Sequence, residues 1–394
     1  MRNWHAAFAL AWSISSLLAG AAAAQPAGRK PAFAVADPKD APHWQAVAEE
    51  AGWLTIVPGG ADTDTGDTRV QALSTAVRGA IVNAGADPAH IYLAGRGDAA
   101  ASVFYAISRL PDLFAAGIAI GGSPQTALST GHVYGVNFGN SPVLWVTENE
   151  SDETTAQKLK AAGMWMEWRP AGGLKNSDVF AWLAGHTREA FPLDVDCETD
   201  SPSFASCFWL APGKFDVNER NDVLPHTLIA AAAPAALDLG AFGYKPDDAG
   251  PGVLVAHLPA KYSGPLKLGD RIIELDGRPV ANAREFQEMM AKVNEERRAV
   301  AMVLRGKVRT RVETRILVPH HDFLPTARVQ GKYDPSQNQI QIISRSVTEM
   351  RVTIPDAWTG ASLWWNGLAL EKMEKAGCTR LTMDKELLHT ARCE

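Results

Sequence analysis

The sequence has no surplus of positive charge and no long hydrophobic run beyond its N-terminus. Its 394 residues include 38 lysines and arginines against 44 aspartates and glutamates, which gives a formal net charge of −6. Proteins that bind nucleic acid need a basic face, so we expect no nucleic-acid partner. A membrane span needs roughly 18 consecutive apolar residues. We therefore expect no stable membrane span once the N-terminal segment is removed.

Cysteine is scarce as well. The four cysteines fall into two pairs that are local in sequence, Cys197 with Cys207 and Cys378 with Cys393. Neither pair has the C-x2-C spacing of zinc sites and no histidine pair lies nearby, so we predict no metal and no cofactor. Four cysteines allow three disulfide connectivities. Of these we favour the local one, in which each pair closes its own loop.

The N-terminus is typical of a signal peptide. Arg2 supplies a positive charge, an apolar run covers residues 6–20, and small residues end at Ala24 as a cleavage site. We expect residues 1–24 to be removed and the protein to be periplasmic or secreted, an oxidising setting that permits disulfides. The alternative is an uncleaved membrane anchor, which the short run disfavours. No cysteine follows the run to carry a lipid.

Between residues 31 and 191, apolar strands alternate with helical segments. Runs such as residues 33–36 and 143–146 are almost continuously apolar, as are strands that are buried on both faces. Amphipathic stretches separate them, for example residues 70–84, which end at Gly85. The pattern predicts an α/β fold with a doubly wound, mostly parallel sheet that helices cover on both faces.

One strand–turn–helix segment looks like a catalytic motif without its nucleophile. An apolar strand over residues 91–94 runs into Gly95-Arg96-Gly97-Asp98-Ala99, and a helix of small and apolar residues follows. The segment resembles the nucleophile elbow G-x-S-x-G of α/β-hydrolases, specifically secreted esterases and polyester-depolymerase-like members. The resemblance covers residues 31–191 and is carried by DPAHIYLAGRGDAAASVFYAISRLPDLFAAGIAIGGSP and SPVLWVTENESDETTAQKLKAAG.

Compared with that family residue by residue, the catalytic groups are missing. Gly97 stands in the place of the serine and offers no side chain for attack on a carbonyl. Leu174 stands where the family's histidine base is expected. The first loop, residues 37–40, lacks the glycine pair that presents oxyanion donors, which leaves the N–H of Asp98. The elbow Gly95, Gly97 and Asp98 therefore implies a hydrolase-like domain without hydrolase chemistry.

Five other residues are fallback candidates for catalysis. Ser102 and Ser123 are the alternative nucleophiles near the elbow. Glu150 and Asp152 follow the strand after which the family's acid is found, and His186 lies at the end of the last helix. Each of these types is more often structural or solvated than catalytic, because a nucleophile needs an adjacent base.

Residues 192–235 break the alternation, contain Pro202, Pro212 and Pro225 among other prolines, and are expected to be a linker. The following unit, residues 236–319, contains GPLKLGDRIIELDGRPV, which resembles the signature of bacterial PDZ domains. That resemblance implies an α+β domain that binds an extended peptide or a protein C-terminus. Such a ligand adds a strand beside a sheet edge while a loop of backbone N–H groups holds the terminal carboxylate.

The PDZ-like resemblance assigns a peptide-binding site. The loop pattern x-apolar-Gly-apolar fits Ala241-Phe242-Gly243-Tyr244, in which the glycine frees the backbone to turn its N–H groups inward. Phe286 and Met290, on a helix that begins after Asn282, face this loop. The alternative is that the aromatic residues and the methionine belong to the core of the unit.

Residues 320–394 alternate like strands and contain Asn366-Gly367, a strong hairpin signal. We predict a small antiparallel β-domain that the last cysteine pair closes. Trp364 and Trp365 point to opposite faces, so one of them is free to bind an envelope polymer, unless loops bury both. His320-His321 is a poor metal pair for the same reason.

The absent triad favours a binding function over an enzymatic one. Our first hypothesis is an exported, catalytically inactive α/β-hydrolase-like protein that acts as a peptide- or protein-binding or scaffold module through its PDZ-like domain. The alternative is an esterase or peptidase that uses a non-standard nucleophile. A third hypothesis is an envelope-associated protein that binds a polymer through the C-terminal tryptophans.

Overall fold

Six parallel strands form the central sheet of the N-terminal part of the chain. The computed structural model describes residues 28–60, 66–229, 235–293, 295–318, 325–370, 372–384 and 387–393, so the expected signal peptide and His320-His321 lie outside the described residues. The strand order is β2-β1-β3-β4-β5-β6, with every pair parallel. The strands are β1 (Lys30–Val35), β2 (Leu54–Ile56), β3 (Ala86–Arg96), β4 (Ala116–Ile120), β5 (Val143–Thr147) and β6 (Met166–Pro170).

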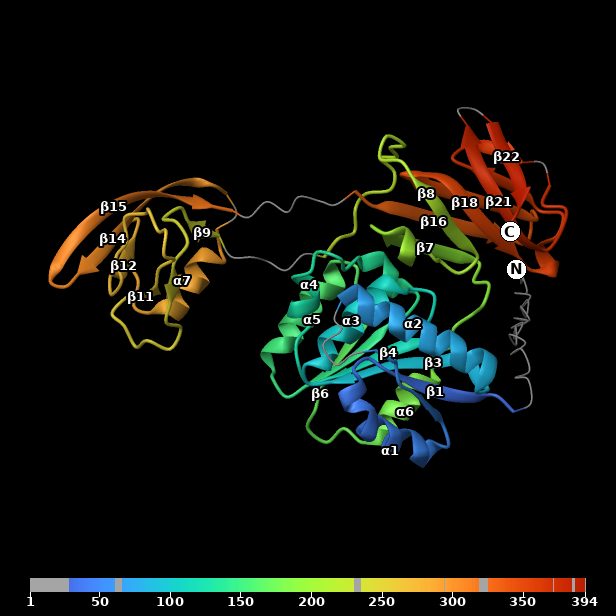
Figure 1. Ribbon diagram of the computed structural model, residues 1–394, viewed down its shortest axis with the longest axis horizontal. Coiled ribbons are helices and arrows are strands. Elements are labelled where there is room, and N and C mark those ends of the chain that lie inside the picture. Colours follow the sequence, from blue (N-terminus) through green and yellow to red (C-terminus); the bar gives the residue numbers. More distant parts are fainter. Residues whose placement is uncertain are drawn as a thin grey trace, which may run out of the picture.

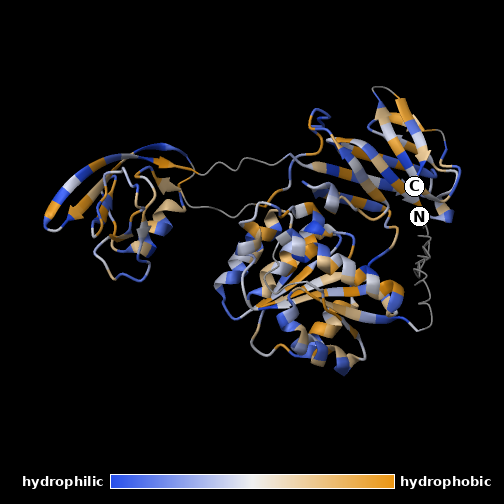
Figure 2. Ribbon diagram, in the orientation of Figure 1, coloured by the Kyte–Doolittle hydropathy of each residue, from blue (hydrophilic) through white to orange (hydrophobic). Residues whose placement is uncertain are grey.

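Helices cover both faces of this sheet, as the alternating pattern predicts. Phe33 and Val35 of β1 pack in one core cluster with α1 and α6, while Ala32 and Ala34 pack in another with α2, α3 and α5 (Figure 1). Figure 2 shows hydrophobic residues along the central strands and hydrophilic residues on the outer helix surfaces. The doubly wound parallel sheet is therefore confirmed. The helices are α1 (Ala41–Ala51), α2 (Gly66–Asn83), α3 (Ala99–Arg109), α4 (Gln125–Leu128), α5 (Ser151–Ala161) and α6 (Asn176–Ala184).

A second unit, residues 235–318, has one helix against a strongly bent sheet and lies apart from the rest in Figure 1. Its strand order is β10-β11-β12-β14-β15-β9, and β13 pairs with β12. The Asn282 side chain accepts a 3.0 Å hydrogen bond from the N–H of Glu285 and so caps helix α7 (Ala283–Met290). The strands are β9 (Ala236–Leu237), β10 (Gly243–Tyr244), β11 (Val253–His257), β12 (Arg271–Leu275), β13 (Arg278–Pro279), β14 (Arg297–Arg305) and β15 (Val308–Leu317).

The segment expected to be a linker, residues 192–235, instead contributes two strands to the C-terminal domain. β7 (Asp194–Thr199) pairs with β16 (Ala327–Asp334), and β8 (Leu210–Phe215) pairs with β18 (Val347–Ile354). Pro212 is tolerated because β8 is the edge strand of its sheet. The domain is thus built from two separate stretches of sequence, and the second unit is inserted between them. We call it the composite β-domain.

The composite β-domain consists of two sheets around one core. One sheet has the order β20-β19-β17-β16-β7 and the other β22-β21-β18-β8. The expectation of a purely antiparallel domain is wrong at one pair, because β17 and β19 are parallel. The chain crosses to the other sheet as β18 before it returns, so β19 runs in the same direction as β17. The remaining strands are β17 (Gln339–Arg345), β19 (Ser362–Trp365), β20 (Leu368–Leu370), β21 (Gly377–Asp384) and β22 (Leu387–Arg392).

Both disulfides have the local connectivity. Cys197 pairs with Cys207 across the turn region between β7 and β8, and Cys378 on β21 pairs with Cys393 just beyond β22. The second bond joins two strands that already pair in one sheet, whereas the first joins β7 of one sheet to the segment that leads into β8 of the other. Within the described residues, no helix is both long and apolar enough to be a membrane span.

A buried arginine joins the α/β domain to the composite β-domain. The side chain of Arg109, on α3, is 1% exposed and forms ion pairs with Asp67 of α2 and with Asp200, which follows β7. His132 and Tyr134 also hydrogen-bond to the Asp200 carboxylate. Burial alone would raise the pKa of Asp200, but the hydrogen bond and the positive charge of Arg109 outweigh it, so this pKa lies below its usual value.

We predict that Asp200→Asn destabilises the protein by about 3 kcal/mol at pH 7, because it leaves part of a buried charge uncompensated. Because the folded-state pKa of Asp200 lies below the unfolded value of about 3.9, ionised Asp200 stabilises the fold at any pH above about 3.9. This stabilisation is lost as the pH falls through the folded-state pKa. The gap between wild type and variant should therefore narrow below about pH 4. Urea unfolding at several pH values measures it.

The matched control is Asp194→Asn at the exposed start of the same strand, which should change the free energy of unfolding by less than about 0.5 kcal/mol. Equal losses for Asp194→Asn and Asp200→Asn, or a gap that does not depend on pH, would contradict the assignment of Asp200 as an ionised anchor.

Candidate functional site

The turn after β3 has the backbone of an elbow and no nucleophile. Gly97 has a left-handed φ of 53°. Its N–H donates to the Ile120 carbonyl at 2.8 Å, and its own carbonyl accepts from the N–H of Ala100 at 3.1 Å. At Gly95, a Cβ would lie 2.5 Å from the Ala99 carbonyl oxygen, so only glycine lets helix and strand approach this closely.

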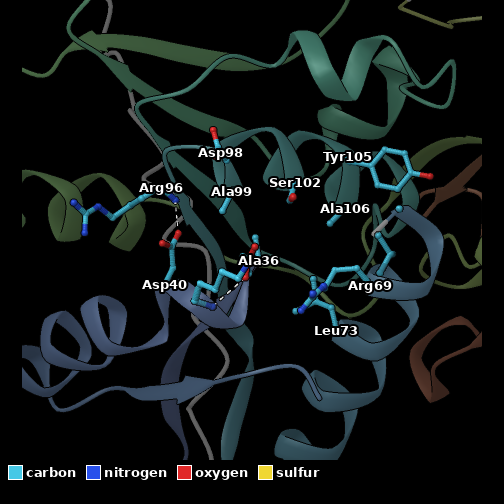
Figure 3. Close-up of a pocket in the computed structure, with 14 residues that line it drawn as sticks. Ala36, Asp40, Arg69, Leu73, Arg96, Asp98, Ala99, Ser102, Tyr105 and Ala106 are labelled. Atoms are coloured by element: carbon cyan, nitrogen blue, oxygen red, sulfur yellow. Dashed lines mark hydrogen bonds between the residues drawn. The ribbon is translucent and has the colours of Figure 1, made fainter. Parts of the chain in front are cut away.

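A pocket of about 440 Å³ lies beside this elbow, where the carboxyl ends of β1 and β3 meet helices α2 and α3 (Figure 3). Carboxyl ends of parallel strands are where α/β folds place their ligands. The Ser102 hydroxyl, the Arg69 guanidinium and the Tyr105 ring lie on its walls. Neither Arg69 nor Tyr105 is among the candidate residues that the sequence suggests.

Two acids occupy the loop where oxyanion donors would be needed. Asp40, at the end of the short 3-10 helix Pro38–Asp40, accepts a 2.7 Å hydrogen bond from the backbone N–H of Arg96. Asp37 accepts from the N–H of Lys39 at 3.0 Å. The exposed Asp98 follows Gly97 directly. Carboxylates repel a developing oxyanion, so this arrangement disfavours acyl transfer.

No histidine is among the described residues that line this pocket. His186 lies near the start of β3, because the next segment returns there and the N–H of Arg188 donates to the Ala89 carbonyl at 2.9 Å. Strand β3 separates Ala89 from Gly97 by about 26 Å, at about 3.3 Å per residue. The ring of His186 packs on Trp182 with a centroid distance of 4.2 Å. These contacts describe a structural residue.

His43 is a histidine near the elbow that the sequence analysis did not identify. It lies in the first turn of α1. Burial and the positive charge of Arg96 lower its pKa, whereas the negative charge of Asp40 raises it, and the net result is a lowered pKa. The lowered pKa favours the neutral form of the imidazole. His43 is not among the residues that line the pocket.

The other fallback candidates lie at or just before the starts of helices. The Ser123 hydroxyl accepts from the N–H of Gln125 at 3.2 Å, which gives it a role at the start of α4. Glu150 and Asp152 lie at the start of α5, where negative charge suits the helix dipole. Leu174 packs half-buried against the core beneath α1 and α6. The structure therefore brings Ser102, and none of these other candidates, into the pocket.

The expected peptide-binding residues gather between β10 and α7. β10 is the edge strand of its sheet, and Tyr244 at its end accepts a 2.7 Å hydrogen bond from the side-chain amide of Gln287 on α7. Phe242 and Tyr244 are partly buried, and Ala241 is exposed. Phe286 and Met290 are 6% and 1% exposed. The two helix residues thus belong to the core of the unit, in line with the alternative that the sequence left open.

Among the residues that the structure describes, no group of three or more histidine, cysteine, aspartate or glutamate side chains could hold a metal ion together.

Comparison with known proteins gives weak similarity to esterases. No protein-family model matches the chain, and no curated protein sequence matches it either. Among solved structures, a thermostable esterase aligns at 16% identity with a TM-score of 0.33, over 42% of this chain and 57% of that one. The esterase PE8 aligns at 16% identity with a TM-score of 0.29, over 40% of this chain and 93% of that one. Neither match assigns the chain to a family. The parallel sheet with helices on both faces fits an α/β-hydrolase-like fold.

The elbow glycines allow a matched test of close packing. Gly97 and Gly122 both have left-handed backbones, with φ of 53° and 61°, so alanine strains both alike. A Cβ at Gly97 meets open space, whereas a Cβ at Gly122 would lie 2.1 Å from the Gly97 carbonyl oxygen. We predict a loss of about 1 kcal/mol for Gly97→Ala, from the backbone alone. Gly122→Ala should lose several times more in thermal or urea unfolding. Similar losses in the two variants would contradict this packing.

Proposed function

We propose that this chain is an exported binding or scaffold protein whose α/β-hydrolase-like domain is catalytically inactive. The observation that carries the proposal is the elbow itself, in which Gly97 takes the nucleophile's place. The absence of a histidine among the described lining residues and the position of Asp40 support it. Two disulfides are in keeping with export to an oxidising compartment.

The binding function belongs to the PDZ-like unit in this proposal. The edge position of β10 supports it, because an edge strand has unpaired backbone groups to which an extended peptide can add. The loop before Gly243 supplies the backbone N–H groups for a terminal carboxylate. Phe242 and Tyr244 give the last side chain of the peptide an apolar surface. The partner is therefore an extended peptide or a protein C-terminus.

An esterase or peptidase with a non-standard nucleophile is the second candidate. The position of Ser102 on the pocket wall favours it, because this hydroxyl is within the same cavity as Arg69 and Tyr105. No histidine lines the cavity within the described chain, so the serine lacks the base that most often activates a serine nucleophile.

Fluorophosphonate labelling separates the two functions. We expect the purified protein to give no label and no turnover of short-chain aryl esters above a heat-treated control, because no side chain at residue 97 can be acylated. The variants Ser102→Ala and Ser123→Ala should behave like wild type. Labelling that either variant abolishes would overturn the inactive assignment and identify the nucleophile.

Peptide binding is tested with a peptide library that has free C-termini and an otherwise identical library with C-terminal amides. We expect the full chain to select peptides from the first library only, since the amide removes the charge that the loop holds. Phe242→Ala should lower the affinity for the selected peptide about tenfold, which corresponds to about 1.4 kcal/mol of binding free energy. Val308→Ala, on the exposed hairpin of the same unit, should leave binding unchanged. Equal selection from both libraries would refute carboxylate recognition.

A further inference from the structure

A row of polar and aromatic side chains crosses one face of the composite β-domain. Trp364 on β19 is paired with Gln341 on β17, Gln341 with Lys332 on β16, and Lys332 with Asp194 on β7. Directly paired residues in a sheet project from the same face. All four are exposed, so they form a continuous strip of surface across four strands.

The opposite face of these strands is core. Trp365, next to Trp364, is completely buried, and its indole N–H donates to the Ser344 hydroxyl at 2.8 Å. Trp364 is 43% exposed. The two tryptophans that the sequence placed on opposite faces therefore differ in function, since one fills the core and the other leaves a flat ring on the surface.

A second row deepens the strip into a groove. Ile343 on β17 is paired with Gln330 on β16, and Gln330 with Asp196 on β7. A groove of about 450 Å³ lies over these residues, and Val136 and Asn140 of the α/β domain contribute to its lining. It therefore lies where the two domains meet, a common position for ligand sites.

The charges in the groove already have partners. Lys332 Nζ lies 3.9 Å from a carboxylate oxygen of Asp194. Asp196 accepts hydrogen bonds from Arg328, at 3.0 and 2.7 Å, and from the Gln330 amide at 2.7 Å. A strongly charged ligand has little to gain here. What the strip offers is a flat aromatic ring, amide groups and paired polar groups, all able to exchange hydrogen bonds.

We propose that this strip is a binding site for a neutral, hydroxyl-rich polymer, a polysaccharide chain. The apolar face of a sugar ring stacks on Trp364, and its hydroxyl groups exchange hydrogen bonds with Gln341, Lys332 and Asp194. The four strands span about 14 Å, three strand spacings, which accommodates a short oligosaccharide. A protein partner is disfavoured because only Trp364 and Ile343 are large exposed apolar side chains on these rows.

The site is separate from the peptide-binding surface proposed for the PDZ-like unit. The full chain is incubated with insoluble cellulose, chitin and purified peptidoglycan, and the retained fraction is measured. Titration with cellohexaose or chitohexaose then gives the affinity for soluble oligosaccharide. We expect retention on at least one polymer, and Trp364→Ala should weaken it at least tenfold. Gln341→Ala should weaken it less, and Trp364→Phe, which keeps a ring, should retain most of the binding.

The matched control is Trp165→Ala, because Trp165 is 55% exposed on the α/β domain and is not among the residues that line the groove. It should bind as wild type does. Thermal unfolding shows whether each variant is folded, and the exposed Gln341→Ala carries the test if Trp364→Ala lowers the midpoint. Retention on none of the three polymers would overturn the proposal. So would retention that the Trp364 and Gln341 variants leave unchanged. Neither result bears on peptide selection by the PDZ-like unit.

Discussion

The buried guanidinium of Arg109 fixes how the α/β domain and the composite β-domain meet. Its side chain is 1% exposed, lies between the carboxylates of Asp67 and Asp200 and stacks 4.3 Å from the centre of the Phe204 ring. A charge so deeply buried is tolerated only when its partners are held in place. The residues just after β7 are therefore held against α3. Because β16 pairs with β7, this contact also positions β16 relative to the α/β domain. The groove at the junction of the two domains depends on this arrangement.

A second buried ion pair stands where the inserted unit leaves the composite β-domain. The carboxylate of Glu198 on β7 is fully buried and accepts from Arg345, Thr227 and Thr326. Burial would raise the pKa of Glu198, but these hydrogen bonds and the charge of Arg345 outweigh it and lower that pKa. Thr227 and Thr326 lie on the two chain segments that lead to and from the insertion. One carboxylate thus holds both ends of the insertion together, and the domain closes around them.

The sequence predicted the parallel sheet well because its signal is local. The strand around Phe33 and the strand around Trp145 are apolar at nearly every position, and a buried parallel strand requires this. The sequence predicted the part of the C-terminal domain that follows the inserted unit but not β7, which precedes it. β7 alternates acidic and apolar residues, and its partner strand β16 lies beyond the inserted unit. A pairing at such separation leaves no local pattern to read.

The same distinction applies to the sites. Gly97 could be located from the sequence because the strand–turn–helix motif fixes its place along the chain. Arg69 and Tyr105 could not, since helices α2 and α3 bring them to one pocket only in three dimensions. Strand alternation predicted that Trp364 and Trp365 face opposite ways. Which of them is exposed depends on the side of the sheet that the rest of the domain covers.

The glycines explain why an elbow can persist without its chemistry. Gly95 is needed because the Ala99 carbonyl oxygen would lie 2.5 Å from any Cβ, and Gly122 because the Gly97 carbonyl oxygen would lie 2.1 Å away. These contacts seat α3 on the sheet and place Arg109 at its far end. The turn is therefore required by packing, whether or not a nucleophile stands on it. A Cβ at residue 97 would meet open space, so only the left-handed backbone, and not the packing around it, disfavours a side chain there. In the inactive protein that we propose, this packing keeps intact the scaffold that carries the two proposed binding surfaces.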